Sequence, residues 1–292
     1  MRVLLVGATG MLGRPVARAL AGDDALSLRA LVRDPARART VLPASVEIVR
    51  GDLRDASALD DAMRDVDAVY MSLNTPFNPR EAFDPDRDGA RLIVEASRRN
   101  GSPWLLRLSA LEAGNERSKW WAIARKREAD AAVMAHTGAW TIFRPAWFME
   151  SLALFRVGPC ATCFRAPGDT PLHWISGADY GAQVRAALMN GLGQGSVIPV
   201  QGPDAATMRD AIVRFARACS PRLRVVQTPY AALRAASLVH PRARYLRELL
   251  AETFAYATEF RASQTWETLG RPTMTIEDYA RSIAQTGDWP RK

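Results

Sequence analysis

The first thirteen residues constrain this chain more than any other stretch. An apolar run at positions 3–6 is followed by three glycines at intervals of three, Gly7, Gly10 and Gly13. Such a run is typical of a strand buried on both faces of a parallel sheet. The apolar positions that follow recur at helical spacing: Leu12, Val16 and Leu20. The chain therefore begins with a predicted strand, a tight glycine turn and a helix.

This arrangement suits the pyrophosphate of a dinucleotide. Gly7 allows the sharp turn off the strand, Gly10 lets the backbone approach the phosphates, and Gly13 permits close packing of helix on strand. The helix N-terminus then offers free N–H groups to the anion. A purely structural turn is the alternative. The cofactor contacts that we predict here are Gly7, Thr9, Gly10, Met11, Leu12 and Gly13.

Length and composition favour an ordinary globular protein. The 292 residues are 48% hydrophobic and 24% charged, enough for one large α/β domain with a smaller lobe. No apolar run reaches the ~18 residues that a membrane span needs, and the first strand leaves no room for a signal peptide. We therefore expect a cytoplasmic protein that has no membrane partner.

The net charge of +8 does not point to nucleic acid. The 39 basic residues are spread along the chain, and only Lys119, Lys126 and Lys292 are lysines. A nucleic-acid-binding protein would concentrate them in an arm or patch, and no helix-turn-helix pattern accompanies them. We predict no nucleic-acid partner, and a monomer or homodimer.

The three cysteines do not form a disulfide framework. Cys160 and Cys163 have the spacing of a redox or metal motif, but no second Cys or His pair lies at a matching interval. We therefore predict reduced thiols in a connecting hairpin, and no metal site.

The pattern after the first helix predicts an α/β fold, a doubly wound parallel sheet of the Rossmann type. Further strands are expected at 27–33, 46–49, 66–74, 104–109 and 140–145, with helices between them that include 88–100 and about 117–136. The predicted domains are an NAD(P)-binding Rossmann domain at 1–150 and a smaller α+β lobe at 151–292, packed on the sheet's edge. Within the lobe we expect strands at 196–200 and 224–227 and helices near 178–190, 205–219 and 241–262.

The end of the second strand predicts which dinucleotide binds. Arg33 stands at its tip with Arg37 one helical turn behind, and arginine there favours the 2′-phosphate of NADP over the free hydroxyl of NAD. Asp34 complicates this prediction, because its carboxylate can accept from a ribose hydroxyl. A solvated basic helix start is the alternative. We predict NADP(H), with NAD(H) less favoured.

The end of the fourth strand should pass under the nicotinamide. Ligands of open parallel sheets bind beyond the carboxyl ends of the strands. This places Ser72, Leu73 and Asn74 at the cofactor. Asp55 is a predicted N-cap for the helix that follows the third strand.

Several motifs together resemble the NmrA-like atypical short-chain dehydrogenase/reductases. They are Gly-Ala-Thr-Gly-Met-Leu-Gly at 7–13, Val-Arg-Asp-Pro at 32–35, Gly-Asp-Leu at 51–53, Leu-Ser-Ala at 108–110, Lys-Arg-Glu-Ala-Asp at 126–130 and Thr-Ile-Phe-Arg-Pro-Ala-Trp-Phe-Met-Glu at 141–150. The resemblance is strongest over the first 150 residues and continues more weakly beyond them. That family includes NADPH-dependent reductases of quinones, phenylpropanoids and alkaloid intermediates, and also NAD(P)-binding regulators without evident turnover.

The resemblance implies further site residues. It places Asp52 and Leu53 beside the adenine, and Ser109 at the position of the usual catalytic Ser or Thr. Lys126 takes the lysine position of a Tyr-x-x-x-Lys pair, but Ala122 stands where the tyrosine is expected. We predict Lys126 and Ser109 as catalytic residues, with Lys126 also holding the cofactor. A surface lysine and a serine that satisfies local backbone are the alternatives.

Aromatic residues near that position predict a slot for a planar substrate. Trp121, Trp147 and Phe148 are the expected walls, although core packing between sheet and lobe explains such residues equally well.

Two functions remain open from the sequence. The first is an NADPH-dependent oxidoreductase acting on a small planar, quinone-like or enone-like molecule, with the proton supplied by Lys126, water or the substrate itself. The second is a non-catalytic NADP(H)-binding redox sensor that acts through protein partners, which the absence of the tyrosine supports. A sugar-nucleotide epimerase or dehydratase is a weaker reading, because those enzymes generally keep the pair.

Overall fold

The main domain is built on one seven-stranded parallel sheet. The computed structural model describes residues 1–158, 160–165, 170–220, 222–256, 259–287 and 289. The strands follow the order β10-β6-β5-β4-β1-β2-β3, and every neighbouring pair is parallel. Their bounds are β1 Arg2–Val6, β2 Ser27–Val32, β3 Glu47–Arg50, β4 Ala68–Met71, β5 Trp104–Leu108, β6 Trp140–Pro145 and β10 Ser196–Val200. This is the doubly wound α/β fold that the sequence predicts.

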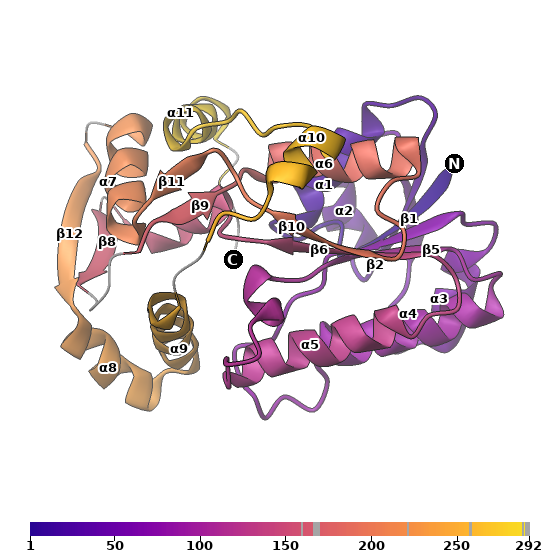
Figure 1. Cartoon of the computed structure of the whole chain (residues 1–292), viewed down its shortest axis with the longest axis horizontal. Helices are drawn as coiled ribbons and strands as arrows, with labels where there is room; N and C mark the ends of the chain where they lie inside the picture. Colours follow the sequence, from indigo (N-terminus) through magenta and orange to yellow (C-terminus); the bar gives the residue numbers. More distant parts are fainter. Residues whose placement is uncertain (159, 166–169, 221, 257–258, 288, 290–292) are drawn as a thin grey trace.

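Helices cover both faces of this sheet (Figure 1). One face carries α1 (Gly13–Ala21), α2 (Pro35–Val41) and α6 (Gly177–Asn190), and the other carries α3 (Ala56–Met63), α4 (Arg87–Arg99) and α5 (Trp121–Met134). Each face has its own apolar core, because the strands between them are buried on both sides. The predicted N-cap is confirmed, since Asp55 Oδ1 accepts from the backbone N–H groups of Ser57 and Ala58.

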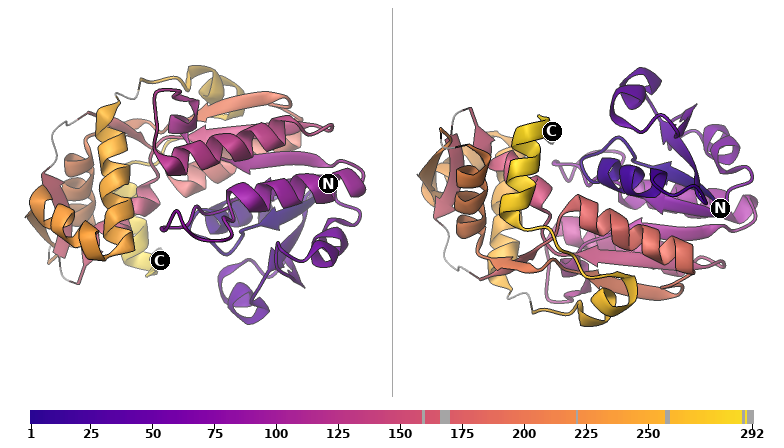
Figure 2. Two further views of the ribbon diagram at one scale, coloured as in Figure 1. Left: turned by 90° about the horizontal axis from the view of Figure 1, so that it is seen from below. Right: turned by 90° about the horizontal axis from the view of Figure 1, so that it is seen from above.

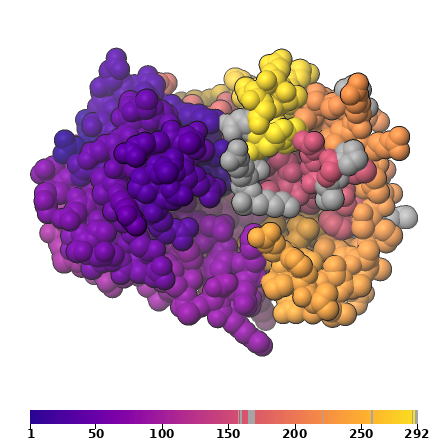
Figure 3. All heavy atoms as spheres, turned by 180° about the vertical axis from the view of Figure 1, so that it is seen from behind, coloured from indigo at the N-terminus to yellow at the C-terminus, as the bar shows by residue number. Residues whose placement is uncertain are grey.

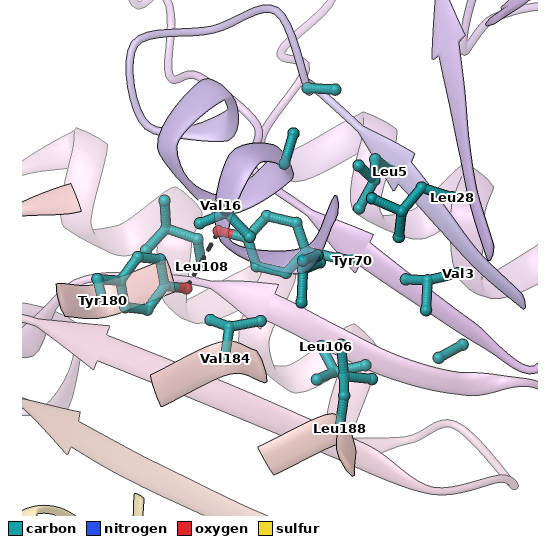
Figure 4. Packing of buried hydrophobic residues seen from close by; sticks show 14 of the residues in the cluster. Val3, Leu5, Val16, Leu28, Tyr70, Leu106, Leu108, Tyr180, Val184 and Leu188 are labelled. Atoms are coloured by element: carbon teal, nitrogen blue, oxygen red, sulfur yellow. Dashed lines mark hydrogen bonds between the residues drawn. The ribbon is translucent and has the colours of Figure 1, made fainter. Parts of the chain in front are cut away.

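Side chains from distant segments meet in the first of these cores (Figure 4). Val3 and Leu5 of β1 lie against Val16 of α1 and the buried face of α6. Tyr70 and Tyr180 are almost fully buried, and their hydroxyl oxygens are 3.2 Å apart. Burial raises the pKa of both phenols. Tyr180 is therefore a core residue and holds its proton firmly.

A smaller lobe lies at one end of the sheet domain in both views of Figure 2. It contains the sheet β12-β8-β7, the antiparallel pair β11-β9 and helices α7, α8, α9 and α11, around a separate apolar core. In Figure 3 its orange atoms stand beside the indigo-to-purple sheet domain, with yellow α11 at the junction. The bounds are η2 Met149–Phe155, β7 Arg156–Val157, β8 Cys160–Arg165, β9 Leu172–Trp174, β11 Asp204–Ala206, α7 Met208–Cys219, β12 Arg224–Pro229, α8 Tyr230–Val239, α9 Pro241–Ala255 and α11 Ile276–Thr286.

The strand expected at 196–200 lies elsewhere than predicted. The sequence predicts it within the small lobe. In the structure it is β10, which extends the main sheet by pairing in parallel with β6. A parallel neighbour needs a crossover, and α6 supplies it by packing against α1. Later in the chain, α10 (Ser263–Leu269) also returns to this domain and packs on α6 and β10.

Two predicted helices are too long. The helix expected from about residue 117 begins at Trp121, because Arg127 donates to the carbonyls of Asn115 and Ser118 and holds that segment as a loop. The helix expected at 241–262 ends at Ala255. Beyond it, the buried Gln201 side chain donates a hydrogen bond to the carbonyl of residue 259 and accepts one from the N–H of residue 261. These hydrogen bonds hold both residues outside any helix.

The cysteines occupy the predicted hairpin. β7 pairs antiparallel with β8, which carries Cys160 and Cys163, and both thiols are free. Across the part of the chain that the structure describes, no helix combines the length and apolar character needed to cross a bilayer.

Glu150 is a buried carboxyl at the junction of the two parts. Its Oε1 accepts from the Gly177 N–H at 2.8 Å. Burial, aided by the nearby Asp179 carboxylate, raises its pKa to about 7 despite hydrogen bonds and Arg14. The pKa of Glu150 is higher in the folded chain than the ~4.3 usual for an unfolded one. The free energy of unfolding should therefore fall as the pH rises from about 4.3 to about 7.

We expect Glu150→Gln to stabilise the protein above neutral pH by about 2–3 kcal/mol and to have little effect near pH 4. The amide keeps the acceptor for Gly177 and removes the buried charge. Urea unfolding at several pH values measures this, with Glu95→Gln on the exposed face of α4 as control. If the difference in free energy of unfolding between variant and wild type were the same at every pH, the raised pKa of Glu150 would be contradicted.

Candidate functional site

The glycine turn has the geometry that a pyrophosphate requires. Gly7 has φ +83°, and a Cβ there would lie 2.1 Å from the Ser72 carbonyl oxygen. A Cβ on Gly13 would lie 2.1 Å from the Gly7 carbonyl oxygen, so only glycine fits at either position. The turn is closed by the Gly10 N–H, which donates to Gly7 O at 3.0 Å. Helix α1 therefore starts directly against β1 with its N-terminus facing the carboxyl ends of the strands.

A cavity of about 750 Å³ opens at that end of the sheet and runs under the small lobe. Its walls bring together residues from the segments that follow β1, β2, β4 and β6, from the end of β5, and from α5 and α9. The predicted site residues that line it are Thr9, Gly10, Met11, Leu12, Arg33, Arg37, Ser72, Leu73, Asn74, Ser109, Lys126, Trp147 and Phe148. Most of the predicted cofactor-binding residues therefore lie around one cavity.

The basic side chains at the end of β2 are available to a ligand. Arg33 and Arg37 are exposed and line the cavity. No carboxylate among the described residues lies within ion-pair distance of either guanidinium. Asp34 is engaged instead as the N-cap of α2, where its side chain accepts from the Arg37 N–H at 3.0 Å.

Asp52 and Leu53 are absent from the cavity wall. Asp52 forms a bidentate pair with Arg54, at 2.9 and 3.0 Å. Those hydrogen bonds lower the pKa of Asp52 to about 2. Leu53 packs against the apolar core on the α3 and α4 face. Their contact with adenine stays a prediction.

Substitution of Arg33 tests the choice of cofactor. We expect Arg33→Ala to raise the dissociation constant for NADPH by about 10- to 100-fold, because it removes charge-assisted hydrogen bonds to the 2′-phosphate. Binding of NADH should change little. Fluorescence titration with both nucleotides measures this. The matched control is Arg39→Ala, which is exposed on the following helix α2 but outside the cavity wall. Equal losses for both nucleotides would contradict a 2′-phosphate contact.

Lys126 is held at the cavity by a buried ionic network. Its Nζ lies 2.6 Å from Asp86 Oδ2, which also accepts from Thr75 Oγ1 at 2.8 Å. Asp86 Oδ1 forms an ion pair with Arg107 Nη2 at 2.8 Å, and both side chains are fully buried. Burial opposes ionisation of Asp86, but Arg107 and Lys126 outweigh it and lower its pKa to about 2. Asp86 thus stays charged and fixes the ammonium group.

Ser109 is tied to the other side of the same network. Its Oγ donates to Asp130 Oδ2 at 2.9 Å. Asp130 also pairs with Arg107 at 2.9 Å and Arg144 at 2.9 Å. The hydroxyl hydrogen is therefore committed to Asp130, and what Ser109 offers the cavity is an acceptor oxygen.

The aromatic walls differ in one member from those predicted. Trp147 and Phe148 line the cavity, as does Trp120, whereas Trp121 lies behind that wall. Trp121 packs under the Arg125 guanidinium, 4.9 Å from its ring centre. Both neighbouring indole N–H groups, of Trp120 and Trp121, donate to Glu248 Oε2 on α9, at 3.1 and 2.9 Å. This double hydrogen bond fastens the small lobe to the sheet domain.

The position of the missing tyrosine is also on the cavity wall. Ala122 is buried one helical turn before Lys126. Three acidic side chains that the sequence did not predict as site residues line the same cavity: Glu112, Tyr245 and Glu252. Glu112 lies three residues after Ser109, and this closeness in sequence is the one feature that could have marked Glu112 as a site residue. The other two come from α9, more than a hundred residues away.

The fold and site define an NAD(P)-binding Rossmann protein. A dinucleotide fits because the two glycine positions leave no room for a Cβ, the cavity follows the strand ends, and two guanidinium groups face its adenosine end.

Comparisons with known proteins indicate the same class of protein. A family model described as NAD(P)H-binding matches residues 7–154, and the chain belongs to this family. The NmrA-like resemblance is confirmed, since the matches include an NmrA-like family domain-containing oxidoreductase from Cladobotryum, 26% identical over 54% of this chain and 49% of its own length.

Several relatives extend over the whole chain. A (4-alkanoyl-5-oxo-2,5-dihydrofuran-3-yl)methyl phosphate reductase from Streptomyces griseus is 31% identical over 97% of this chain and 98% of its own length. An NAD(P)H azoreductase from Xenophilus azovorans is 25% identical over 97% and 98%. The structure of the quinone oxidoreductase QOR2 from Escherichia coli, complexed with NADPH, shares the fold with a TM-score of 0.74 at 20% identity, over 96% of this chain and 99% of that one. All three are named as reductases or oxidoreductases, and two of the names include NAD(P)H or NADPH, which supports an oxidoreductase.

Proposed function

We propose that this protein is an NADPH-dependent reductase of a small planar molecule with a conjugated carbonyl, enone-like or quinone-like. The observation that carries the proposal is one cavity that joins the glycine turn, the fixed Lys126 ammonium and an apolar wall to which the sheet domain and the small lobe both contribute. A wall of Trp120, Trp147, Phe148, Leu246 and Leu249 suits a flat apolar ligand.

The relatives support this class of substrate. One is named as the reductase of an alkanoyl- and oxo-substituted dihydrofuran, and another protein of the same fold is named a quinone oxidoreductase. Hydride transfer to a conjugated acceptor needs less help from a protein acid than reduction of an isolated ketone. This is consistent with the alanine at position 122.

Each part of the site has a distinct task. The reduced nicotinamide supplies the hydride. The helix α1 N-terminus binds the pyrophosphate, and Arg33 and Arg37 bind the 2′-phosphate. Lys126 donates hydrogen bonds to the nicotinamide ribose from a position that Asp86 fixes. The aromatic wall from α5 and the segment after β6 orients the substrate and excludes water.

The test is oxidation of NADPH across a panel of enones and quinones, followed by its absorbance, together with calorimetric binding of NADPH and NADH. We expect tight NADPH binding and turnover of at least one conjugated acceptor, with saturated ketones unreactive. Tight NADPH binding without turnover of any acceptor would contradict the reductase and favour the sensor alternative, for which a pull-down with and without NADP(H) is the direct assay.

A further inference from the structure

The cavity wall that holds the position of the missing tyrosine also carries a carboxyl group. Glu112 belongs to the short helix η1 (Leu111–Gly114), which follows the carboxyl end of β5. It lines the cavity together with Ser109, Ala122 and Lys126. Its side chain is partly buried, with its open side toward the cavity.

A second carboxyl faces it from the small lobe. Glu252 of α9 lines the same cavity, and its Oε1 is buried without a hydrogen-bond partner among the described residues. The Glu252 carboxylate opposes the ionisation of Glu112. Two carboxyls that share a poorly solvated space cannot both be charged at low cost, so such a pair retains a proton.

The charged groups around Glu112 come from three elements. Lys126 of α5 favours its ionised form, and Glu252 of α9 opposes it. Arg144 of β6 lies behind η1, within 3.0 Å of the position a Cβ on Gly114 would take, but it is paired with Asp130. Burial comes first among the causes, and with Glu252 it raises the pKa of Glu112 above the ordinary value.

We propose that Glu112 is the proton donor of the reduction, and that Glu252 is a positioning residue that keeps it protonated. This inference rests on the proposed function. The hydride leaves the reduced nicotinamide with its electron pair and bonds to the electrophilic carbon of the conjugated acceptor. The Glu112 O–H bond breaks as its proton moves to the resulting enolate, and the carboxylate takes up a proton from water afterwards. NADPH is oxidised, and the acceptor gains two electrons and two hydrogens.

Tyr245 and Ser109 suit this role less well. The Tyr245 ring packs against Phe77, Trp120 and Trp121, and burial together with nearby carboxylates raises its pKa, so the phenol holds its proton. The Ser109 hydrogen is committed to Asp130. Glu112 is a carboxyl on this wall whose pKa is raised above the ordinary value and whose proton no hydrogen bond among the described residues commits elsewhere.

The first experiment reads the Glu112 proton without turnover. An infrared pH titration of the NADPH complex should show the carbonyl stretch of a protonated carboxylic acid above about pH 5, where an ordinary Glu is ionised. Glu150, whose pKa is raised to about 7, contributes to this band in every variant. The part of the band that belongs to Glu112 should be lost in Glu112→Gln and retained in Glu116→Gln, an exposed control on the adjoining segment. A spectrum of Glu112→Gln identical to that of the wild type above this pH overturns the proposal.

The second experiment measures turnover of an enone that the wild type reduces. Glu112→Gln should lower kcat by about 10²- to 10⁴-fold, while the dissociation constant of NADPH stays within about threefold. Glu116→Gln should retain most activity. In the wild type kcat should fall as the pH rises through the Glu112 pKa, and Glu252→Gln should move that fall to lower pH, which a merely structural role of Glu252 does not predict.

These outcomes separate the two levels of inference. Wild-type turnover with an equally active Glu112→Gln overturns the role of Glu112 and leaves the reductase intact. Absence of wild-type turnover with every acceptor overturns the proposed function itself, and the role of Glu112 falls with it.

Discussion

Arg107→Leu is expected to lower the free energy of unfolding by about 3–5 kcal/mol. The guanidinium is fully buried and contacts Asp86 and Asp130, both within 3 Å. Leucine fills part of the volume but leaves two buried carboxylates without their shared partner. Asp86 retains Lys126 and Asp130 retains Arg144, so the folded state survives with weaker pairing. Urea unfolding followed by circular dichroism measures the loss.

Two further variants show whether buried charge causes the effect. Arg107→Lys keeps the charge but cannot span both carboxylates with one planar group, so its stability should lie between those of the wild type and Arg107→Leu. Arg91→Ala breaks an exposed pair with Glu128 on the same side of the domain and should cost less than about 1 kcal/mol. If Arg107→Leu were as stable as Arg91→Ala, the network would not hold the site together.

The sequence predicts the sheet domain well because its signals are local. The glycine turn, the arginine at the end of β2 and the lysine on α5 each follow a strand or helix whose periodicity is visible within about ten residues. In a parallel sheet all strand ends meet at one edge, so Arg33, Ser72 and Lys126 reach one cavity once those strands exist. No long-range information is needed for that step.

The errors arise where one residue or one partner decides the outcome. A five-residue strand such as β10 has the same pattern in either sheet, and the packing of α6 on α1 determines its place. Trp120 lines the cavity in place of the predicted Trp121. Consecutive residues at the start of a helix point in different directions, and α5 begins later than predicted.

The charged groups of the site were the hardest to predict. Asp86 and Arg107 lie on different elements and are paired only in the folded chain. Glu112 and Glu252 are separated by 140 residues (252 − 112), and neither belongs to a recognised motif. Their meeting depends on how α9 docks on the sheet domain through Glu248, which periodicity does not describe.

Lys126→Met is expected to reduce kcat/KM for NADPH-dependent reduction by about 10²- to 10⁴-fold. The substitution keeps the unbranched stem and removes the ammonium that Asp86 holds 2.6 Å away at the cavity wall. Loss of its hydrogen bonds to the ribose should also weaken NADPH binding by about 10- to 150-fold, since a bond from a charged donor contributes about 1.5–3 kcal/mol. Steady-state kinetics and calorimetry separate these two effects.

Lys119→Met is the matched control, because it makes the same chemical change at an exposed position near the start of the same helix, outside the cavity. It should leave kinetics and binding unchanged. Lys126→Arg keeps the positive charge and the pairing with Asp86 but moves the donors, so cofactor binding should recover more than kcat does. Should Lys126→Met match Lys119→Met in both measurements, Asp86 would be holding a structural lysine, and the cofactor's ribose would need another partner on this wall.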